Sequence, residues 1–258
     1  MKSKYVIKQV VKCSLWMICL GWLMTSTVNA QLAKKGEFKI QRVTDSVYLF
    51  TSYGEFNGRF YPANGLFALT NKGAIIVDGP WDPKDYQPLL DSIWLNHHQK
   101  VILCLATHFH GDRTGALAYY RQKGIETYST KQTDSLSIIH HMNRAAHLMP
   151  GDTTFQVGGF RLETYYPGPG HAPDNIVVWF PREKILYGGC LYKSIDDHDL
   201  GNLSDANISA WPKTIRRVQM RFGKPRYMIV GHGNWHSLHA DTHTIQLAQK
   251  YLKQKKTQ

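Results

Sequence analysis

The sequence predicts an α/β protein built as a four-layer αβ/βα sandwich, in which two similar halves pack together. Strand-like and helix-like segments alternate along both halves of the chain, which is typical of sheets covered by helices. In addition, polar and potentially reactive side chains follow directly after several predicted strands in both halves. We therefore expect the functional site at the seam between the halves.

The first 30 residues have the pattern of an export signal. Four lysines precede the apolar run of residues 13–24, which is too short for an ordinary membrane helix, and residues 28–30 resemble a cleavage site. We therefore predict a signal peptide at residues 1–30, a mature domain at residues 31–258 and a periplasmic location. An uncleaved anchor is the alternative, because Asn29 is an unusual residue beside a cleavage site.

The predicted mature chain is moderately basic. The whole sequence has 31 basic and 19 acidic residues, and residues 1–30 contain four lysines and no acid, so 27 basic residues and a net charge of +8 remain. The surplus forms modest clusters at residues 216–226 and 250–256, which is typical of solvated helix faces. We expect a monomer with no nucleic-acid partner, and no membrane contact after signal cleavage.

The first half of the mature chain predicts mainly strands, followed by helices. Strands are expected at residues 38–43, 46–53, 65–70, 73–78, 101–106 and 126–128. Helices are expected at residues 82–96, 114–122 and 133–146. Asp82 followed by Pro83 is a typical start for the first of these helices. Residues 54–64 are polar and contain glycine, and we interpret them as a flexible flap between strands.

The second half repeats this organisation. Strands are expected at residues 154–157, 160–166, 176–180, 184–188 and 227–230, and helices at residues 207–222 and 241–253. Each half therefore contributes strands and covering helices, which is the basis for the sandwich prediction.

The segment Thr107–Arg113 (T-H-F-H-G-D-R) is the most informative stretch of the chain. It follows the apolar run Val101–Ala106, which predicts a buried strand that ends in this loop. Two imidazoles and one carboxylate lie within five residues of each other, and both groups are common Zn²⁺ ligands. We interpret the loop as half of a metal site. The alternative is a chance meeting of two surface histidines and a helix-capping aspartate.

Three further metal-binding side chains occur in the second half, each beside small residues and a predicted strand. They are His171 in a turn rich in Pro and Gly, Cys190 after two glycines, and His232 between two glycines. Glycine allows close approach of the backbone to a metal. Cys190 could instead form a disulfide with Cys104, although Cys104 lies inside an apolar strand and is more simply a small buried residue.

Five motifs spread over the mature chain together resemble the metallo-β-lactamases. They are H-F-H-G-D-R at 108–113, G-P-G-H-A-P-D-N at 168–175, G-G-C-L-Y-K at 188–193, L-G-N-L-S-D-A-N at 200–207 and G-H-G at 231–233. The similarity is to the thiolate-containing first subclass of class B, and especially to enzymes of flavobacterial type. It implies the αβ/βα fold and a small-molecule β-lactam substrate, whose amide bond a metal-bound hydroxide hydrolyses, conferring antibiotic resistance.

The resemblance also assigns residues to two zinc ions. One ion is expected on His108, His110 and His171, and the other on Asp112, Cys190 and His232. The expected catalytic residues are Asp112 and Asn202, and the expected substrate-binding residues are Lys193 and Asn202. Arg113 is expected to support the site beneath Cys190, and Asp78 is expected to accept a hydrogen bond from a residue of the site.

Two other functions use similar residues. Glyoxalase-type thioesterases usually have a histidine directly after the aspartate of the loop, where this chain has Arg113, and a bridging aspartate where it has Cys190. A non-enzymatic periplasmic zinc-binding protein would need the six ligands but not Lys193 or Asn202. The other nine histidines fit no ligand pattern, and we expect them on the surface.

Overall fold

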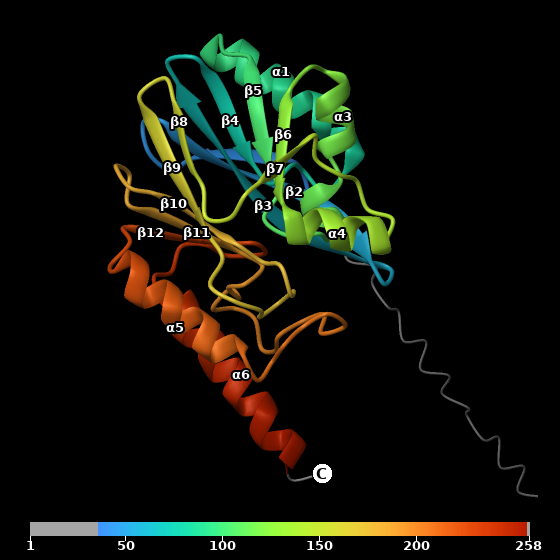
Figure 1. Cartoon of the computed structure of the whole chain (residues 1–258), viewed down its shortest axis with the longest axis vertical. Helices are drawn as coiled ribbons and strands as arrows, with labels where there is room; N and C mark the ends of the chain where they lie inside the picture. The colour runs from blue at the N-terminus through green and yellow to red at the C-terminus, as the bar shows by residue number, and fades with distance from the viewer. Residues whose placement is uncertain (1–35, 257–258) are drawn as a thin grey trace, which may run out of the picture. The chain divides into compact units, whose positions relative to one another are not determined.

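Two β-sheets form the centre of the protein in the computed structural model, which describes residues 36–256 (Figure 1). The predicted signal peptide lies outside the described residues. Within residues 36–256, no helix has both the length and the apolar character that crossing a bilayer requires.

The first sheet has seven strands that lie side by side in chain order. They are β1 (Lys39–Arg42), β2 (Val47–Phe56), β3 (Arg59–Thr70), β4 (Gly73–Val77), β5 (Val101–Leu105), β6 (Glu126–Thr130) and β7 (His147–Met149). Strands β1 to β4 pair antiparallel, and β4 to β7 pair parallel. The parallel strands are connected by helices, as their geometry requires. The carboxyl ends of β4 and β5 therefore lie at the same edge.

The helices of the first half have the following bounds: the 3₁₀-helix η1 (Pro83–Asp85), α1 (Tyr86–His97), α2 (Gly111–Thr114), α3 (Leu117–Gln122) and α4 (Lys131–Ile139). The predicted start of the first helix is confirmed, because the Asp82 side chain accepts a hydrogen bond from the backbone of Lys84.

The second sheet has five strands in the order β12-β11-β10-β9-β8. Its elements are β8 (Thr154–Val157), β9 (Phe160–Tyr165), β10 (Val177–Phe180), β11 (Ile185–Gly189), α5 (Trp211–Phe222), β12 (Tyr227–Val230) and α6 (Ala240–Lys256). Only the pair β11 and β12 is parallel among these described strands, and α5 lies between them in the chain.

Three apolar clusters show that the layers are helix, sheet, sheet and helix. Side chains of both sheets pack together in the middle, including Leu66 of β3 and Ile229 of β12. The outer face of the first sheet packs against α1 and α3, and the outer face of the second packs against α5 and α6 (Figure 1). The predicted αβ/βα sandwich is therefore confirmed, with sheets of unequal size.

The placement of residues 54–64 between strands was wrong. Strands β2 and β3 continue through this segment as a paired hairpin, in which Tyr53 faces Pro62 and Phe56 faces Arg59. Only Asn57 and Gly58 form the turn, with φ values of 50° and 74°. An Asn-Gly pair is the typical sequence for a two-residue hairpin turn, because both positions need positive φ.

Two helix boundaries also differ from the prediction. Helix α4 ends at Ile139, and residues 140–146 form a turn and an irregular segment that lead to the edge strand β7, instead of continuing the helix to residue 146. Helix α5 begins at Trp211, one turn after the predicted start at Asn207. Asn207 instead accepts a hydrogen bond from the backbone of Ala210 in the turn that precedes the helix.

Candidate metal centre

Loops from both sheets bring the six predicted ligands together at one edge of the sandwich. His108, His110 and Asp112 come from the segment between β5 and α3, and His171 comes from the loop between β9 and β10. Cys190 follows β11 directly, and His232 follows β12. Their nitrogen, oxygen and sulfur atoms form three overlapping groups of possible metal ligands. The predicted location at the seam between the sheets is therefore observed.

The first predicted zinc site consists of three imidazole nitrogens. His108 Nε2 and His110 Nδ1 are 3.1 Å apart, and His110 Nδ1 and His171 Nε2 are also 3.1 Å apart. Two nitrogens bound to the same tetrahedral zinc at ordinary bond lengths are about 3.3 Å apart. Both of these distances fit imidazoles that share a single zinc ion.

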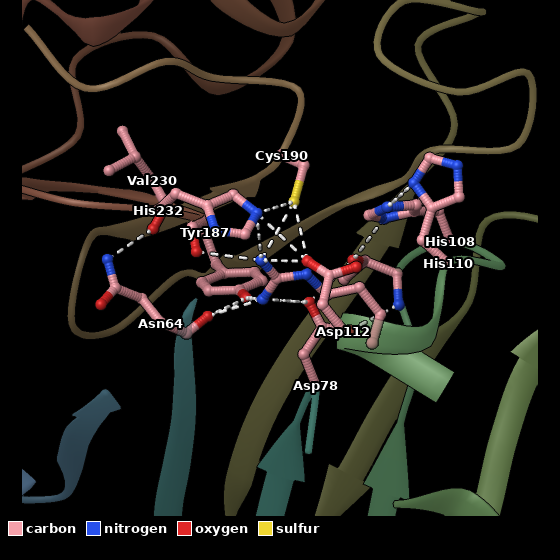
Figure 2. Close-up of polar contacts among 12 residues, drawn as sticks. Asn64, Asp78, His108, His110, Asp112, Tyr187, Cys190, Val230 and His232 are labelled. Carbon is pink, nitrogen blue, oxygen red and sulfur yellow. Dashed lines mark hydrogen bonds and ion pairs between the residues drawn. The ribbon is translucent and has the colours of Figure 1, made fainter. Parts of the chain in front are cut away.

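The second predicted site combines a thiol, an imidazole and a carboxylate (Figure 2). His232 Nε2 is 3.1 Å from Cys190 Sγ and 3.1 Å from Asp112 Oδ2, and Sγ is 3.6 Å from the same oxygen. Donors around a tetrahedral zinc are about 3.3 to 3.6 Å apart when one of them is sulfur or oxygen. This group also fits one zinc ion.

The protonation states of the ligands differ between the two groups. Burial holds the pKa of His108 and of His171 well below the usual range, so both imidazoles are neutral and can bind a metal. Burial opposes ionisation of Asp112, but Arg113 beside it still holds the pKa of this carboxyl well below the usual range. Burial lowers the pKa of His232, whereas Cys190 and Asp112 raise it more strongly, to about 9.

Arg113 lies against all three donors of the second group. Its Nη2 atom is 3.0 Å from Cys190 Sγ, 3.0 Å from Asp112 Oδ2 and 3.2 Å from His232 Nε2, and it donates to the Gly231 carbonyl at 2.9 Å. The side chain is only 1% exposed. Its buried positive charge offsets the negative charge of the Asp112 carboxylate. Arg113 therefore lies where the sequence predicted a supporting residue.

Glycine at position 231 allows Cys190 and His232 to lie side by side. A Cβ atom at this position would lie 2.8 Å from Cys190 Sγ and 2.6 Å from Cys190 N. Any larger residue would separate the ends of β11 and β12. Cys104 and Cys190 are both free thiols, so the alternative of a disulfide between them is wrong.

Asp78 fixes the start of the loop that carries His108. Its carboxylate accepts hydrogen bonds from the Thr107 backbone and from the Thr107 hydroxyl, both at 2.8 Å. Asp78 is fully buried and has a φ of 56°, in the left-handed region that aspartate tolerates better than most residues. Asp78 therefore accepts its hydrogen bonds from Thr107, the residue next to the predicted ligand His108.

The sequence reasoning missed two residues beside this carboxylate. The hydroxyl of Tyr187, in β11, is 2.8 Å from Asp78 Oδ2 (Figure 2). The backbone carbonyl of Asn64, in β3, accepts a hydrogen bond from Arg113 Nη1 at 2.8 Å. Tyr187 followed the pattern of a strand residue, and a backbone carbonyl has no sequence signal.

In two of the histidines, the ring nitrogen that does not face the other predicted ligands contacts an oxygen atom elsewhere in the chain. His110 Nε2 is 3.0 Å from Asp205 Oδ2, and His232 Nδ1 is 2.7 Å from the Pro62 carbonyl. Such contacts orient metal-binding imidazoles. Asp205 stands inside the L-G-N-L-S-D-A-N motif, but the sequence reasoning assigned it no role.

Lys193 and Asn202 are in different surroundings. Lys193 is 8% exposed, and no described carboxylate forms an ion pair with its ammonium group. Asn202 is exposed, and its Oδ1 accepts from the Ser204 backbone at 3.1 Å, which leaves its amide hydrogens available. Among the described residues, Asn202 forms no hydrogen bond with any of the six predicted ligands.

The other nine histidines are not among the predicted ligands, and most of them lie at the surface. Seven are exposed, and His97 and His243 are half-buried. None of them belongs to a group of possible metal ligands in residues 36–256. The expectation of surface positions is confirmed for the seven, whereas His97 packs on Tyr48.

Comparisons with known proteins agree with this geometry. The family model described as the metallo-beta-lactamase superfamily matches residues 59–232. The type 2 metallo-beta-lactamase of Elizabethkingia meningoseptica is 38% identical over 93% of this chain and 96% of its own length. Metallo-beta-lactamase IND-1 of Chryseobacterium indologenes is 33% identical over 93% of this chain and all of its own length. The solved metallo-beta-lactamase from Pontibacter korlensis superimposes with a TM-score of 0.79 at 34% identity, over 83% of this chain and 99% of that one.

Proposed function

The chain belongs to the metallo-β-lactamase superfamily, and from this we propose that two zinc ions bound at the six converging donors enable it to hydrolyse β-lactam antibiotics. As a hydrolase of this kind, it opens the cyclic amide bond of its small-molecule substrate and confers β-lactam resistance. The single observation that carries the proposal for two ions is the convergence of two donor triads with the spacing of tetrahedral zinc ligands.

The two triads would support different parts of the reaction. His108, His110 and His171 would hold one zinc, and Asp112, Cys190 and His232 would hold the other. When bound, zinc lowers the pKa of a water molecule towards about 7 and stabilises negative charge on the leaving nitrogen. The Asp112 carboxylate belongs to donor groups with members of both triads, so it can accept a hydrogen bond from the attacking water and orient it.

Lys193 and Asn202 would bind the substrate. The Lys193 side chain is nearly buried and its ammonium forms no ion pair with a described carboxylate, so it can pair with the carboxylate of a β-lactam. The Asn202 side chain uses its oxygen within its own turn, so its amide can donate to the substrate carbonyl oxygen as negative charge develops there.

The hairpin of β2 and β3 would contact the apolar parts of the substrate. Pro62 in β3 touches His232, and the hairpin continues from there to a tip that exposes Phe56 and Tyr61. Exposed aromatic side chains beside a polar centre are suited to binding a ligand with apolar groups.

We also propose that residues 1–30 direct export to the periplasm and that the mature chain acts as a monomer. The lysines followed by a short apolar run support export.

Hydrolysis of a chromogenic cephalosporin by the purified chain tests the function. We expect turnover that a zinc chelator abolishes, that added zinc restores, and that a serine-acylating inhibitor leaves unchanged. Zinc analysis should give two ions per chain. Turnover in the presence of excess chelator would contradict the zinc mechanism, and zinc binding without any β-lactam turnover would favour a non-enzymatic protein. A thioester substrate serves as the control for the thioesterase alternative, which Arg113 beside Cys190 disfavours.

A further inference from the structure

The Lys193 side chain is only 8% exposed, and the surroundings of its ammonium group are unusual for so buried a lysine. Burial lowers the pKa of Lys193, while Cys190 and Asp197 raise it from a distance. No described carboxylate forms an ion pair with Nζ, and no described acceptor forms a hydrogen bond with it. Buried cations normally have such a partner. The ammonium instead faces the indole ring of Trp211, whose centroid is 5.6 Å from Nζ.

The position of the Trp211 ring is fixed on several sides. Trp211 is the first residue of α5 and is completely buried. Its Nε1 donates to the Leu191 carbonyl at 2.8 Å, so the indole is tied to the segment that joins Cys190 to Lys193. Gly170 packs closely against the ring, because a Cβ atom there would lie 3.1 Å from Trp211 Cδ1.

The backbone of Lys193 is held independently of this ring. Its amide donates to the hydroxyl of Thr244, in α6, at 2.8 Å. The main chain at Lys193 is therefore fixed by α6, and the direction of the long side chain depends on what lies around the ammonium.

We propose that Trp211 is a positioning residue, whose ring holds the Lys193 ammonium in place for the substrate carboxylate by a cation–π contact. The inference rests on the proposed function, in which Lys193 binds that carboxylate. An aromatic ring attracts the cation without occupying its hydrogen-bond donors. A carboxylate in the same place would form an ion pair that the substrate must displace. The ring thus orders a flexible side chain and leaves its charge available.

A double-mutant cycle between Trp211 and Lys193 tests the proposal. Values of kcat and KM for a carboxylate-bearing chromogenic cephalosporin are measured for the parent, Trp211→Leu, Lys193→Ala and the double variant. We expect Trp211→Leu to raise KM by about two- to thirtyfold with little change in kcat, which is the range of a cation–π contact in a partly desolvated site. In the Lys193→Ala background, Trp211→Leu should leave KM unchanged within about twofold.

Two further variants separate positioning from packing. Trp211→Phe keeps an aromatic face but loses the hydrogen bond to Leu191, so its KM should lie between those of the parent and Trp211→Leu. Val218→Ala removes buried volume from the same helix and the same apolar cluster, so it should lower the melting temperature and leave KM unchanged. Zinc content is measured for each variant, because the Trp211 ring centroid is also 6.0 Å from that of His171.

A spectrum of the chain labelled with ¹³C at the lysine ε-carbons provides a readout other than activity. One methylene resonance, absent in Lys193→Ala, should be shifted by the indole ring and should return to the ordinary position in Trp211→Leu. If Trp211→Leu does not fold, Trp211→Phe provides a graded comparison, in which the smaller ring should leave a smaller shift than in the parent. An equal rise of KM in both Lys193 backgrounds, or no ring-dependent shift, overturns the positioning role. A parent chain that hydrolyses no β-lactam instead overturns the proposed function, and the two results are distinct.

Discussion

The Tyr187 hydroxyl lies 2.8 Å from Asp78 Oδ2 and thereby connects the two sheets beneath the candidate metal centre. The same hydroxyl is 2.7 Å from the Asn64 carbonyl and accepts from Arg113 Nη1 at 3.1 Å. A phenol has only one proton to donate. Because Arg113 already donates to the Asn64 carbonyl at 2.8 Å, the tyrosine proton is available to the Asp78 carboxylate.

This relationship predicts a pH-dependent cost for Tyr187→Phe. Burial raises the pKa of Asp78 to about 6, against the opposing effect of Arg113, so the carboxylate is ionised at pH 7.5 and mostly neutral at pH 4.5. Removing a donor to the ionised form raises this pKa further. We expect the variant to lose about 1.5 to 3 kcal/mol of unfolding free energy at pH 7.5 and clearly less at pH 4.5. Urea unfolding of the metal-free chain at both values measures this.

Tyr192→Phe is the matched control for this prediction. Tyr192 is also buried, and its hydroxyl has no hydrogen-bond partner among the described residues. Removing that hydroxyl should therefore leave the unfolding free energy unchanged or slightly higher at both pH values. Equal losses for the two variants, or a larger loss for Tyr187→Phe at pH 4.5, would contradict the role of the bond between Tyr187 and Asp78.

Asp205→Asn should weaken zinc binding at the triad of imidazoles. The carboxylate of Asp205 lies 3.0 Å from His110 Nε2 and also accepts from the Ser204 hydroxyl at 2.8 Å. An amide can keep the contact with His110 but not the negative charge that makes the imidazole a better ligand. We expect about a ten- to hundredfold lower zinc affinity, as for other residues that orient metal ligands. Competition with a coloured chelator measures the affinity.

Ser204→Ala provides a graded comparison for this prediction. It removes only the hydrogen bond to Asp205, so it should reduce zinc affinity by a smaller factor than Asp205→Asn. If both variants bind zinc as tightly as the parent, the contact between Asp205 and His110 does not support the metal site.

The metal-binding residue types and their places at strand ends could be predicted because both are local properties. An apolar run that stops at Thr107-His108 shows the end of a buried strand within a few residues of sequence. The contacts that orient the ligands could not be predicted in the same way. The Pro62 carbonyl beside His232 belongs to a segment 170 residues away in the chain, and every residue has such a carbonyl.

The hairpin of β2 and β3 shows a different kind of failure. The turn signal Asn57-Gly58 is present in the sequence, but the polar composition of residues 54–64 favoured a loop over a hairpin. Helix α4 ends early for a reason that is not local, because residues 140–146 lead the chain back to the position where β7 pairs with β6.

Cys190→Ser should weaken the second triad much more than the first. A hydroxyl is a far poorer zinc ligand than a thiolate. Cys190 Sγ is one of the three donors of the second triad, together with Asp112 and His232. We expect the purified variant to retain about one zinc ion per chain and to lose most of its turnover. Metal analysis together with hydrolysis rates tests this. Cys104→Ala, which removes the other free thiol from the interior of the first sheet, should keep both ions.

Lys193→Ala should raise KM much more than it lowers kcat. The ammonium would contact a substrate carboxylate whose charge does not change during the reaction, so its loss weakens the ground state and the transition state equally. Because Lys193 is only 8% exposed, the pair would be partly desolvated, and its loss should be worth about 2 to 3 kcal/mol. This corresponds to roughly a 30- to 140-fold higher KM. Steady-state kinetics with a carboxylate-bearing cephalosporin measures it.

Salt dependence separates a charge contact from a structural role of Lys193. Higher ionic strength should raise KM of the parent, because salt screens the attraction between the ammonium and the carboxylate, and it should change KM of Lys193→Ala much less. Lys213→Ala removes the same charge from an exposed position in α5 and should behave like the parent. If Lys193→Ala instead leaves KM unchanged and loses zinc, the lysine supports the metal ligands and does not bind the carboxylate. The loss of zinc would then be explained by the effect of Lys193 on His171, because the lysine helps to lower the pKa of that imidazole.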